Sequence, residues 1–132
     1  MRYESPLDAA ALEDLAIRRY FAAVDAKDIE GVLSCLHDEA LFTVQTDFVC
    51  HAGKPAIRRM LRDYFAAFET IVHRNFQLCA DPATGRVAAS FEGVVTTADG
   101  NATHLYNTNI WRVRDTRFQE IHVFMSGPNV LV

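Results

Sequence analysis

The first half of the chain places its apolar residues at the three- and four-residue spacing of amphipathic helices. A first helix is predicted to start at Ser5-Pro6, where Ser5 can cap, Pro6 suits the first helical position and Asp8 reaches back as in a capping box. Asp28 is placed to cap a second helix, and Pro55 opens a third. The apolar positions that define the three helix faces are Leu12, Leu15, Ala16, Tyr20, Ala23, Ile29, Val32, Leu33, Leu36, Ile57, Leu61, Tyr64, Phe65 and Phe68.

The period of the apolar positions changes to two residues after Phe68, which is the period of a β-strand. Asp99-Gly100 is a strong hairpin signal between two of the predicted strands. Helices followed by hairpin-linked antiparallel strands predict an α+β fold, and 132 residues are the length of one domain, residues 1–132. The predicted strands cover residues 71–80, 86–97, 103–113 and 117–126, with an earlier strand beginning at residue 41.

Composition and charge narrow the classes of function. A net charge of −4 with 23% charged residues disfavours binding to nucleic acid or to an anionic membrane surface. The longest apolar runs are too short to span a bilayer, and the N-terminal residues lack the apolar stretch of a signal peptide. Cys35, Cys50 and Cys79 are an odd number without CxxC spacing, so we expect free thiols in a reducing cytoplasm.

Motifs for metal, phosphate or covalent chemistry do not stand out in the sequence. The five histidines are scattered without an HxxxH or HExxH spacing, and Gly53 is an isolated glycine before a helix. We therefore predict no metal and no cofactor, and a small apolar molecule as the partner. Polar groups within an apolar pocket are then the chemistry to look for.

The strand predicted over residues 103–113 gives the best indication of such a pocket. Leu105, Asn107, Asn109 and Trp111 fall on one face of this strand. Burying a side-chain amide without hydrogen-bond partners costs roughly 1–3 kcal/mol. Two asparagines on a face that otherwise belongs to the core therefore suggest that they line a cavity. The alternative is that the other face points inward and the asparagines are exposed.

Three more polar residues allow both a structural and a chemical interpretation. His122 lies in a strand whose two faces both mix polar and apolar residues, so it is either a hydrogen-bonded structural histidine or a proton carrier in the cavity. His73 begins a strand, with Asn75 and Gln77 two and four residues on, and could instead belong to a solvated polar face. Tyr20 is either a core tyrosine with one backbone partner or a donor into the cavity.

Several stretches resemble the nuclear transport factor 2-like superfamily, in particular its SnoaL-like and ketosteroid-isomerase-like branch. The resemblance runs from about Leu12 to Ser126, and it implies a cone of three N-terminal helices packed on a curved, bent antiparallel or mixed β-sheet that encloses a pocket. It also implies a homodimer formed through the outer face of the sheet. The most specific stretches are Arg19–Asp28, Gly53–Arg58, Ile110–Val113 and Glu120–Ser126.

The same resemblance implies roles for individual residues. Alignment with the ketosteroid isomerases places Tyr20 at their oxyanion-hole tyrosine and Asn109 at the protonated aspartic acid that is their second donor. Val44 stands where those enzymes carry their general-base aspartate, so steroid isomerase activity is not expected. Asp47 is near in sequence, but it falls in a predicted turn where its carboxylate would be solvated.

A second relative, scytalone dehydratase, shares other positions. His73 resembles the histidine at the start of its long strand, and Asn107 resembles an asparagine on its penultimate strand. The acidic residue on its first helix has no expected counterpart here, because Ala22 stands at about that position.

The sequence therefore predicts a cofactor-free isomerase, dehydratase or cyclase that acts on a small, apolar, carbonyl-bearing metabolite. Tyr20 and Asn109 would hold the oxyanion, Asn107 would orient the substrate, and His73 or His122 would move the proton. Two other functions stay open, a non-catalytic small-ligand-binding protein and a dimerisation domain. The predicted apolar lining consists of Tyr64, Phe65, Phe68 and Trp111.

Overall fold

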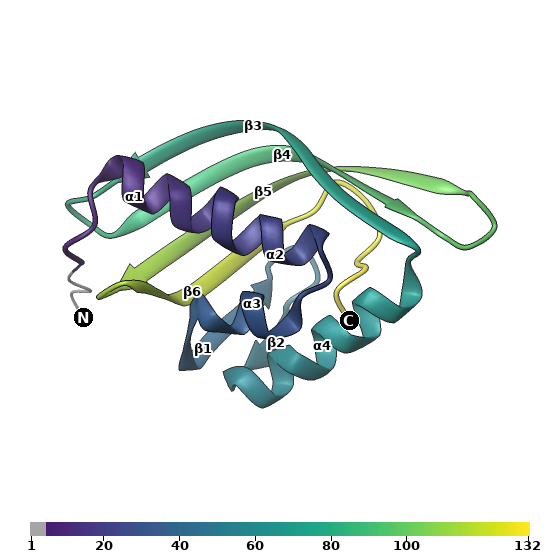
Figure 1. Cartoon of the computed structure of the whole chain (residues 1–132), viewed down its shortest axis with the longest axis horizontal. Coiled ribbons are helices and arrows are strands. Elements are labelled where there is room, and N and C mark those ends of the chain that lie inside the picture. Colours follow the sequence, from purple (N-terminus) through teal and green to yellow (C-terminus); the bar gives the residue numbers. More distant parts are fainter. Residues whose placement is uncertain (1–4) are drawn as a thin grey trace.

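The computed structural model describes residues 5–132, which form a layer of helices packed on one β-sheet (Figure 1). The first helix is a continuous rod made of three segments, and two further helices follow it. Their bounds are α1 (Ala9–Asp14), the π-helical segment η1 (Leu15–Phe21) and α2 (Ala22–Asp25) for the rod, then α3 (Ile29–Ser34) and α4 (Gly53–Ala67).

The six strands form a single mixed sheet in the order β2-β1-β6-β5-β4-β3. β1 pairs with β6 in parallel, and every other neighbouring pair is antiparallel. The α+β prediction of three helices on a mixed sheet is confirmed. Within the described residues, no helix is both long and apolar enough to cross a membrane. The strands are β1 (Leu36–Val44), β2 (Val49–Ala52), β3 (Thr70–Asp81), β4 (Arg86–Thr96), β5 (Ala102–Arg114) and β6 (Arg117–Phe124).

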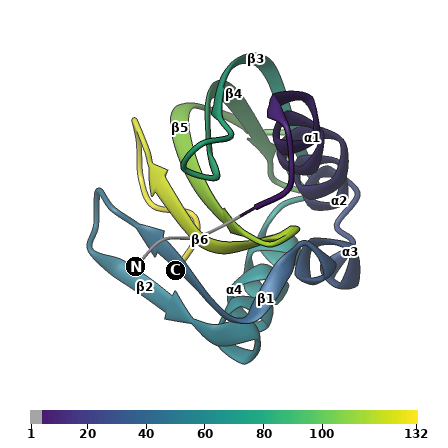
Figure 2. The same cartoon turned by 90° about the vertical axis from the view of Figure 1, so that its left-hand side faces the viewer.

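All helices cover the same face of the sheet, and the core lies between the two layers. α1 contacts β3 and β4, whereas α4 contacts β1 and β2, so the helices meet opposite ends of the strand order. The end-on view shows the sheet curving around them without closing (Figure 2). Trp111, Phe118 and Ile121 are fully buried at the centre of this concave face.

The predicted start of one helix is confirmed by the structure, and the predicted start of another is not. Asp28 caps α3 as predicted, because its Oδ1 accepts the Gly31 N–H at 2.9 Å. The first helix begins at Ala9 rather than at Pro6, and its cap is Asp8, whose Oδ1 accepts the Ala11 N–H at 2.8 Å. The prediction that Ser5 caps this helix was wrong.

The π-helical segment η1 is a feature that the apolar spacing did not indicate. A π-turn inserts one extra residue per turn, so adjacent residues can both approach the covered face. Tyr20 and Phe21 follow each other in sequence, yet both are buried against the sheet. The edge-to-face contact between their rings, with centroids 5.2 Å apart, belongs to this widened turn.

The first strands also extend beyond the prediction. β1 begins at Leu36 rather than at Leu41, and its N-terminal half is irregular, with a register shift against β6 between these two residues. β2 was not predicted from the sequence, because it is only four residues long and alternates half-buried with exposed positions. Asp47 lies exposed in the turn between these strands, as expected.

Candidate functional site

Strand β5 turns its two asparagines toward the helices. Asn107 and Asn109 are buried together with Leu105 and Trp111, whereas Tyr106 on the other face is 66% exposed. The predicted inward face of this strand is therefore confirmed, and the alternative with solvated asparagines is wrong.

A pocket with a volume of about 40 Å³ lies between η1, α4 and the concave face of the sheet. Five of its lining residues carry polar groups, namely Tyr20, Tyr64, His73, Asn107 and Asn109. Apolar residues form the rest of the wall, which keeps the local dielectric constant low and strengthens every polar interaction inside it. The apolar lining residues are Phe21, Val24, Phe42, Leu61, Phe91, Val95, Leu105, Val123, Met125, Val130 and Leu131, with Gly93 between them.

β3 contains a bulge that begins just after His73. The register of β3 against β4 shifts between Arg74 and Gln77, and Asn75 within this gap has φ = 58°. The extra residue sends Asn75 to the outer face, whereas His73 faces inward. The simple alternation that would have placed His73, Asn75 and Gln77 on one face does not hold.

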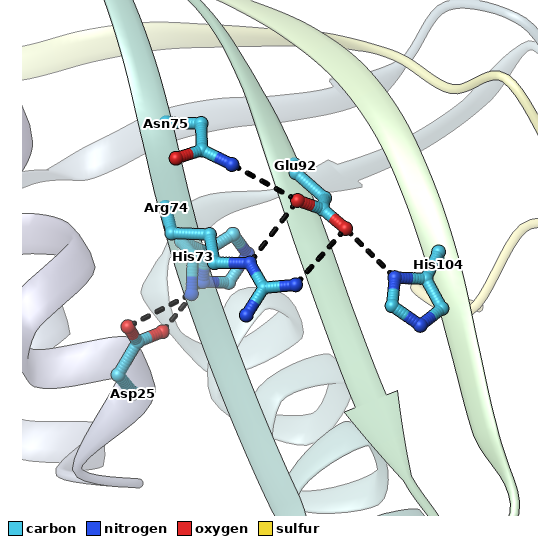
Figure 3. A network of polar contacts seen from close by, with 6 residues as sticks. All are labelled: Asp25, His73, Arg74, Asn75, Glu92 and His104. Carbon is cyan, nitrogen blue, oxygen red and sulfur yellow. Dashed lines mark hydrogen bonds and ion pairs between the residues drawn. The ribbon is translucent and has the colours of Figure 1, made fainter.

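Asp25, at the end of α2, binds His73 through two atoms (Figure 3). Its Oδ1 lies 2.5 Å from His73 Nδ1, and its Oδ2 accepts the backbone N–H of His73 at 3.0 Å. A carboxylate at a helix C-terminus is disfavoured by the helix dipole, so these two contacts offset an unfavourable position. Ala22 stands at about the position of the acidic residue of scytalone dehydratase, and the acid that contacts His73 here is Asp25, three residues later.

The carboxylate decides which nitrogen of His73 can accept a proton. Because ionised Asp25 can only accept, the Nδ1 of His73 must carry a hydrogen, and the basic lone pair of the neutral ring then lies on Nε2. A methyl group at Gly93 would lie 3.7 Å from this Nε2, so the missing side chain leaves room beside it. The imidazole stacks on Phe21 at 4.4 Å and only 10% of its side chain is exposed. His73 is thus held in one orientation toward the cavity.

Tyr20 and Asn109 supply polar groups without a charge. Burial first, and then the nearby Cys35 and Tyr64, raise the pKa of Tyr20 far above its ordinary value, so its phenol stays protonated. Asn109 is 3% exposed, and its buried Oδ1 has no hydrogen-bond partner within the described residues. An unpartnered buried amide oxygen costs roughly 1–3 kcal/mol, which a hydrogen-bond donor of a bound molecule would recover.

Sequence and structure comparisons place this architecture among known proteins. The sequence matches the SnoaL-like domain family over residues 17–121. The chain belongs to the SnoaL-like family. This confirms the predicted membership of the nuclear transport factor 2-like superfamily, whereas no curated protein matches the sequence.

Solved structures confirm the SnoaL-like fold over most of the chain. A protein named as an aromatic ring hydroxylase from Novosphingobium aromaticivorans has a TM-score of 0.77 at 25% identity, over 90% of this chain and 89% of its own. A protein named as an isomerase from Bacillus subtilis has a TM-score of 0.79 at 16% identity, over 92% and 89%. SalBIII, an epoxide hydrolase/cyclase-like enzyme of pyran ring formation in salinomycin, has a TM-score of 0.80 at 14% identity, over 90% and 93%.

Four residues predicted for the site do not line the cavity of this SnoaL-like domain. His122 lies on the outer face of β6, where Nδ1 is 2.6 Å from Gln45 Nε2 and Nε2 is 3.6 Å from Glu120 Oε2. It faces outward because its neighbours Ile121 and Val123 take the two core positions. The other three, Phe65, Phe68 and Trp111, pack behind the cavity wall.

A second polar cluster of the SnoaL-like domain lies on the outer face of the sheet, behind His73 (Figure 3). Oε2 of Glu92 accepts from Arg74 Nε at 3.1 Å and from Asn75 Nδ2 at 3.1 Å, and its Oε1 lies 2.7 Å from His104 Nδ1. The hydrogen bonds from Arg74 and then His104 lower the pKa of Glu92 from 4.5 to about 2. The cluster joins β3, β4 and β5 and holds Asn75, the bulged residue, on the outer face. Within the described residues, no group of three His, Cys, Asp or Glu side chains could hold a metal ion.

The lowered pKa of Glu92 predicts how stability depends on pH. A carboxylate whose pKa falls on folding stabilises the protein fully above about pH 4.5, and this stabilisation is lost as the pH falls toward 2. The variant Glu92→Gln should therefore be less stable than the wild type at neutral pH and should lose less free energy of unfolding on acidification. Urea unfolding between pH 7 and pH 2 measures both effects. Glu39→Gln, at an exposed position of β1, is the matched control. Equal acid dependence of the wild type and Glu92→Gln would contradict the assignment.

Proposed function

We propose that this SnoaL-like protein is a cofactor-free isomerase, dehydratase or cyclase that moves a proton beside the carbonyl of a small apolar metabolite. One observation carries the proposal: the Asp25–His73 pair faces the same cavity as the neutral donors Tyr20 and Asn109. A base, an oxyanion site and an apolar enclosure are the parts that enolisation requires.

The proposed reaction starts at Nε2 of His73. This nitrogen removes a proton from the carbon next to the substrate carbonyl, and Asp25 stabilises the imidazolium that forms. The phenol of Tyr20 and the amide of Asn109 donate to the enolate oxygen. Return of the proton from His73 to another carbon gives an isomer. Its transfer to a hydroxyl on the neighbouring carbon releases that hydroxyl as water and gives a dehydrated product. Attack of the enolate on a second carbonyl closes a ring, and the proton then passes to the new alkoxide.

The proposed base lies at a different position from the base of the ketosteroid isomerases, so the presence of Val44 does not prevent proton transfer. Val44, which the resemblance places at the base of the ketosteroid isomerases, is fully buried and does not line the cavity. In our proposal the base comes instead from β3, through His73. The names of the structural neighbours, which include a cyclase-like enzyme and a protein named as an isomerase, favour this class of reaction.

The alternative function is binding of a small apolar ligand without turnover. The apolar residues that form most of the cavity wall favour it. The two functions differ in what His73 does. A binding protein needs the imidazole only for its shape and hydrogen bond, whereas an enzyme needs its basicity.

Deuterium incorporation into 2-tetralone separates the two functions without knowledge of the natural substrate. This ketone carries acidic hydrogens beside its carbonyl, so we expect the protein to accelerate their exchange in D₂O, measured by NMR. His73→Ala should lower the exchange rate roughly 10²–10⁴-fold, which is the usual contribution of a positioned base. Tyr20→Phe should lower it about 10²–10³-fold, which is the usual loss for one oxyanion donor.

His122→Ala is the matched control, since it removes a histidine that lies on the outer face of β6 and does not line the cavity. Its exchange rate should equal that of the wild type. Equal rates for the wild type, His73→Ala and Tyr20→Phe would contradict catalysis. Equal exchange rates, together with an affinity for 2-tetralone that is the same in the wild type and the variants, would instead favour the binding function.

We also propose that the protein is a cytoplasmic homodimer formed through the outer face of the sheet. Three large apolar side chains on this face are exposed, namely Val72 at 42%, Tyr106 at 66% and Phe124 at 42%. Exposed apolar residues gathered on one face are typical of an interaction surface. The three free cysteines favour a reducing compartment.

The variant Tyr106→Arg tests the dimer. It places a charge at the centre of the proposed interface, and this charge would have to lose its hydration when two subunits associate. Sedimentation velocity should give a dimer for the wild type and a monomer for the variant at the same concentration. Arg86→Ala, on the exposed end of β4, should leave the dimer intact. A monomeric wild type at concentrations of about 100 μM, well above the dissociation constant of a specific dimer, would contradict this part of the proposal.

A further inference from the structure

The segment that follows β6 forms part of the cavity wall. Figure 1 shows this trace leaving the end of β6 and running back toward α4. We call residues 127–131 the C-terminal strap. Its apolar residues Val130 and Leu131 line the same cavity as His73 and Asn109 and pack against the core. The strap has no helical or strand structure.

The strap is held by few hydrogen bonds. Nε2 of His51 donates to the carbonyl oxygen of Leu131 at 3.0 Å, and the Leu131 N–H donates to Oδ1 of Asn129 at 2.8 Å. At its root, the Ser126 N–H donates to Oδ1 of Asn107 at 3.3 Å. Within the described residues, no backbone–backbone hydrogen bond joins the strap to the sheet. Opening the strap therefore breaks far fewer interactions than moving a strand or helix would.

While the strap is in place, the cavity is too small for the substrate proposed above. About 40 Å³ is room for a few water molecules, whereas a cavity that binds benzene measures roughly 150 Å³. A carbonyl compound with even one ring therefore does not fit beside His73 without a displacement. The other walls are strands and helices of a close-packed core, which resist such a change. The strap is the part of the wall that can yield.

We propose that Val130 and Leu131 are an internal plug, which occupies the place of the substrate's apolar body and withdraws when the substrate binds. The identity of the substrate rests on the function proposed above, whereas the plug itself rests on the cavity. Because the displaced groups are aliphatic, the part of the ligand that replaces them must be apolar. The two side chains then set which ring systems the site accepts, since a ligand must outcompete them.

The plug also shares an anchor with the substrate. Asn107 lines the cavity and at the same time accepts from Ser126 at the root of the strap. A ligand oxygen would accept from Nδ2 of Asn107, whereas Ser126 donates to its Oδ1. One side chain can therefore contact both the ligand and the residue before the strap.

Affinity for 2-naphthol, measured by isothermal titration calorimetry, tests the plug. The double variant Val130→Ala/Leu131→Ala removes most of the plugging volume and should bind 2-naphthol about tenfold more tightly than the wild type, the factor that corresponds to roughly 1.4 kcal/mol. His51→Ala leaves the cavity lining unchanged but removes the latch on Leu131, so its affinity should also rise. Val132→Ala is the matched control, because Val132 is the neighbouring residue and is 71% exposed.

Each other outcome overturns the inference. Weaker binding by the double variant would make the strap a lid that encloses the ligand. Equal affinities for all four proteins would mean that the strap does not compete with the ligand, and no saturable binding by any of them would mean that the cavity does not open. Because 2-naphthol undergoes no isomerisation or dehydration here, its affinity is independent of turnover. Failure of the plug and failure of the proposed catalysis are thus seen in separate assays.

Discussion

The contact between Asp25 and His73 is the interaction on which the site depends. It joins the end of the first helix to the third strand, and it places a proton on Nδ1 so that Nε2 can act as a base. The bulge at Asn75, which Glu92 contacts on the outer face, follows His73 and shifts the residues after it to different faces. The fold of the family thus supplies a cavity, and in our proposal the hydrogen-bonded Asp25–His73 pair in its wall supplies the base.

The features that the sequence predicted are those that local pattern determines. The α+β order follows from the change of apolar period after Phe68, and the cap at Asp28 follows from side-chain chemistry within one turn. The inward face of β5 was predictable because alternation fixes the side of every residue once one is known. Tyr20, His73 and Asn109 were named as candidates, and the structure brings all three to one cavity.

The features that the sequence missed depend on breaks in periodicity or on distant contacts. The π-helical segment and the bulge at Asn75 each add one residue, which shifts every later position to a different face. Asp25 could not be paired with His73, because 48 residues separate them. One signal was present: a carboxylate at a helix C-terminus is unfavourable without a partner. The strap over the cavity is neither a helix nor a strand, so its sequence has no periodic pattern that could have predicted it.

The tautomer of His73 tests this account most directly. Long-range ¹H–¹⁵N NMR of the neutral imidazole should show the proton on Nδ1 and an unprotonated Nε2 in the wild type. Asp25→Asn should shift the population toward the Nε2–H form, because the amide can donate to Nδ1. A wild-type ring protonated on Nε2 when neutral, or an Asp25→Asn spectrum identical to that of the wild type, would contradict the role we give to this pair.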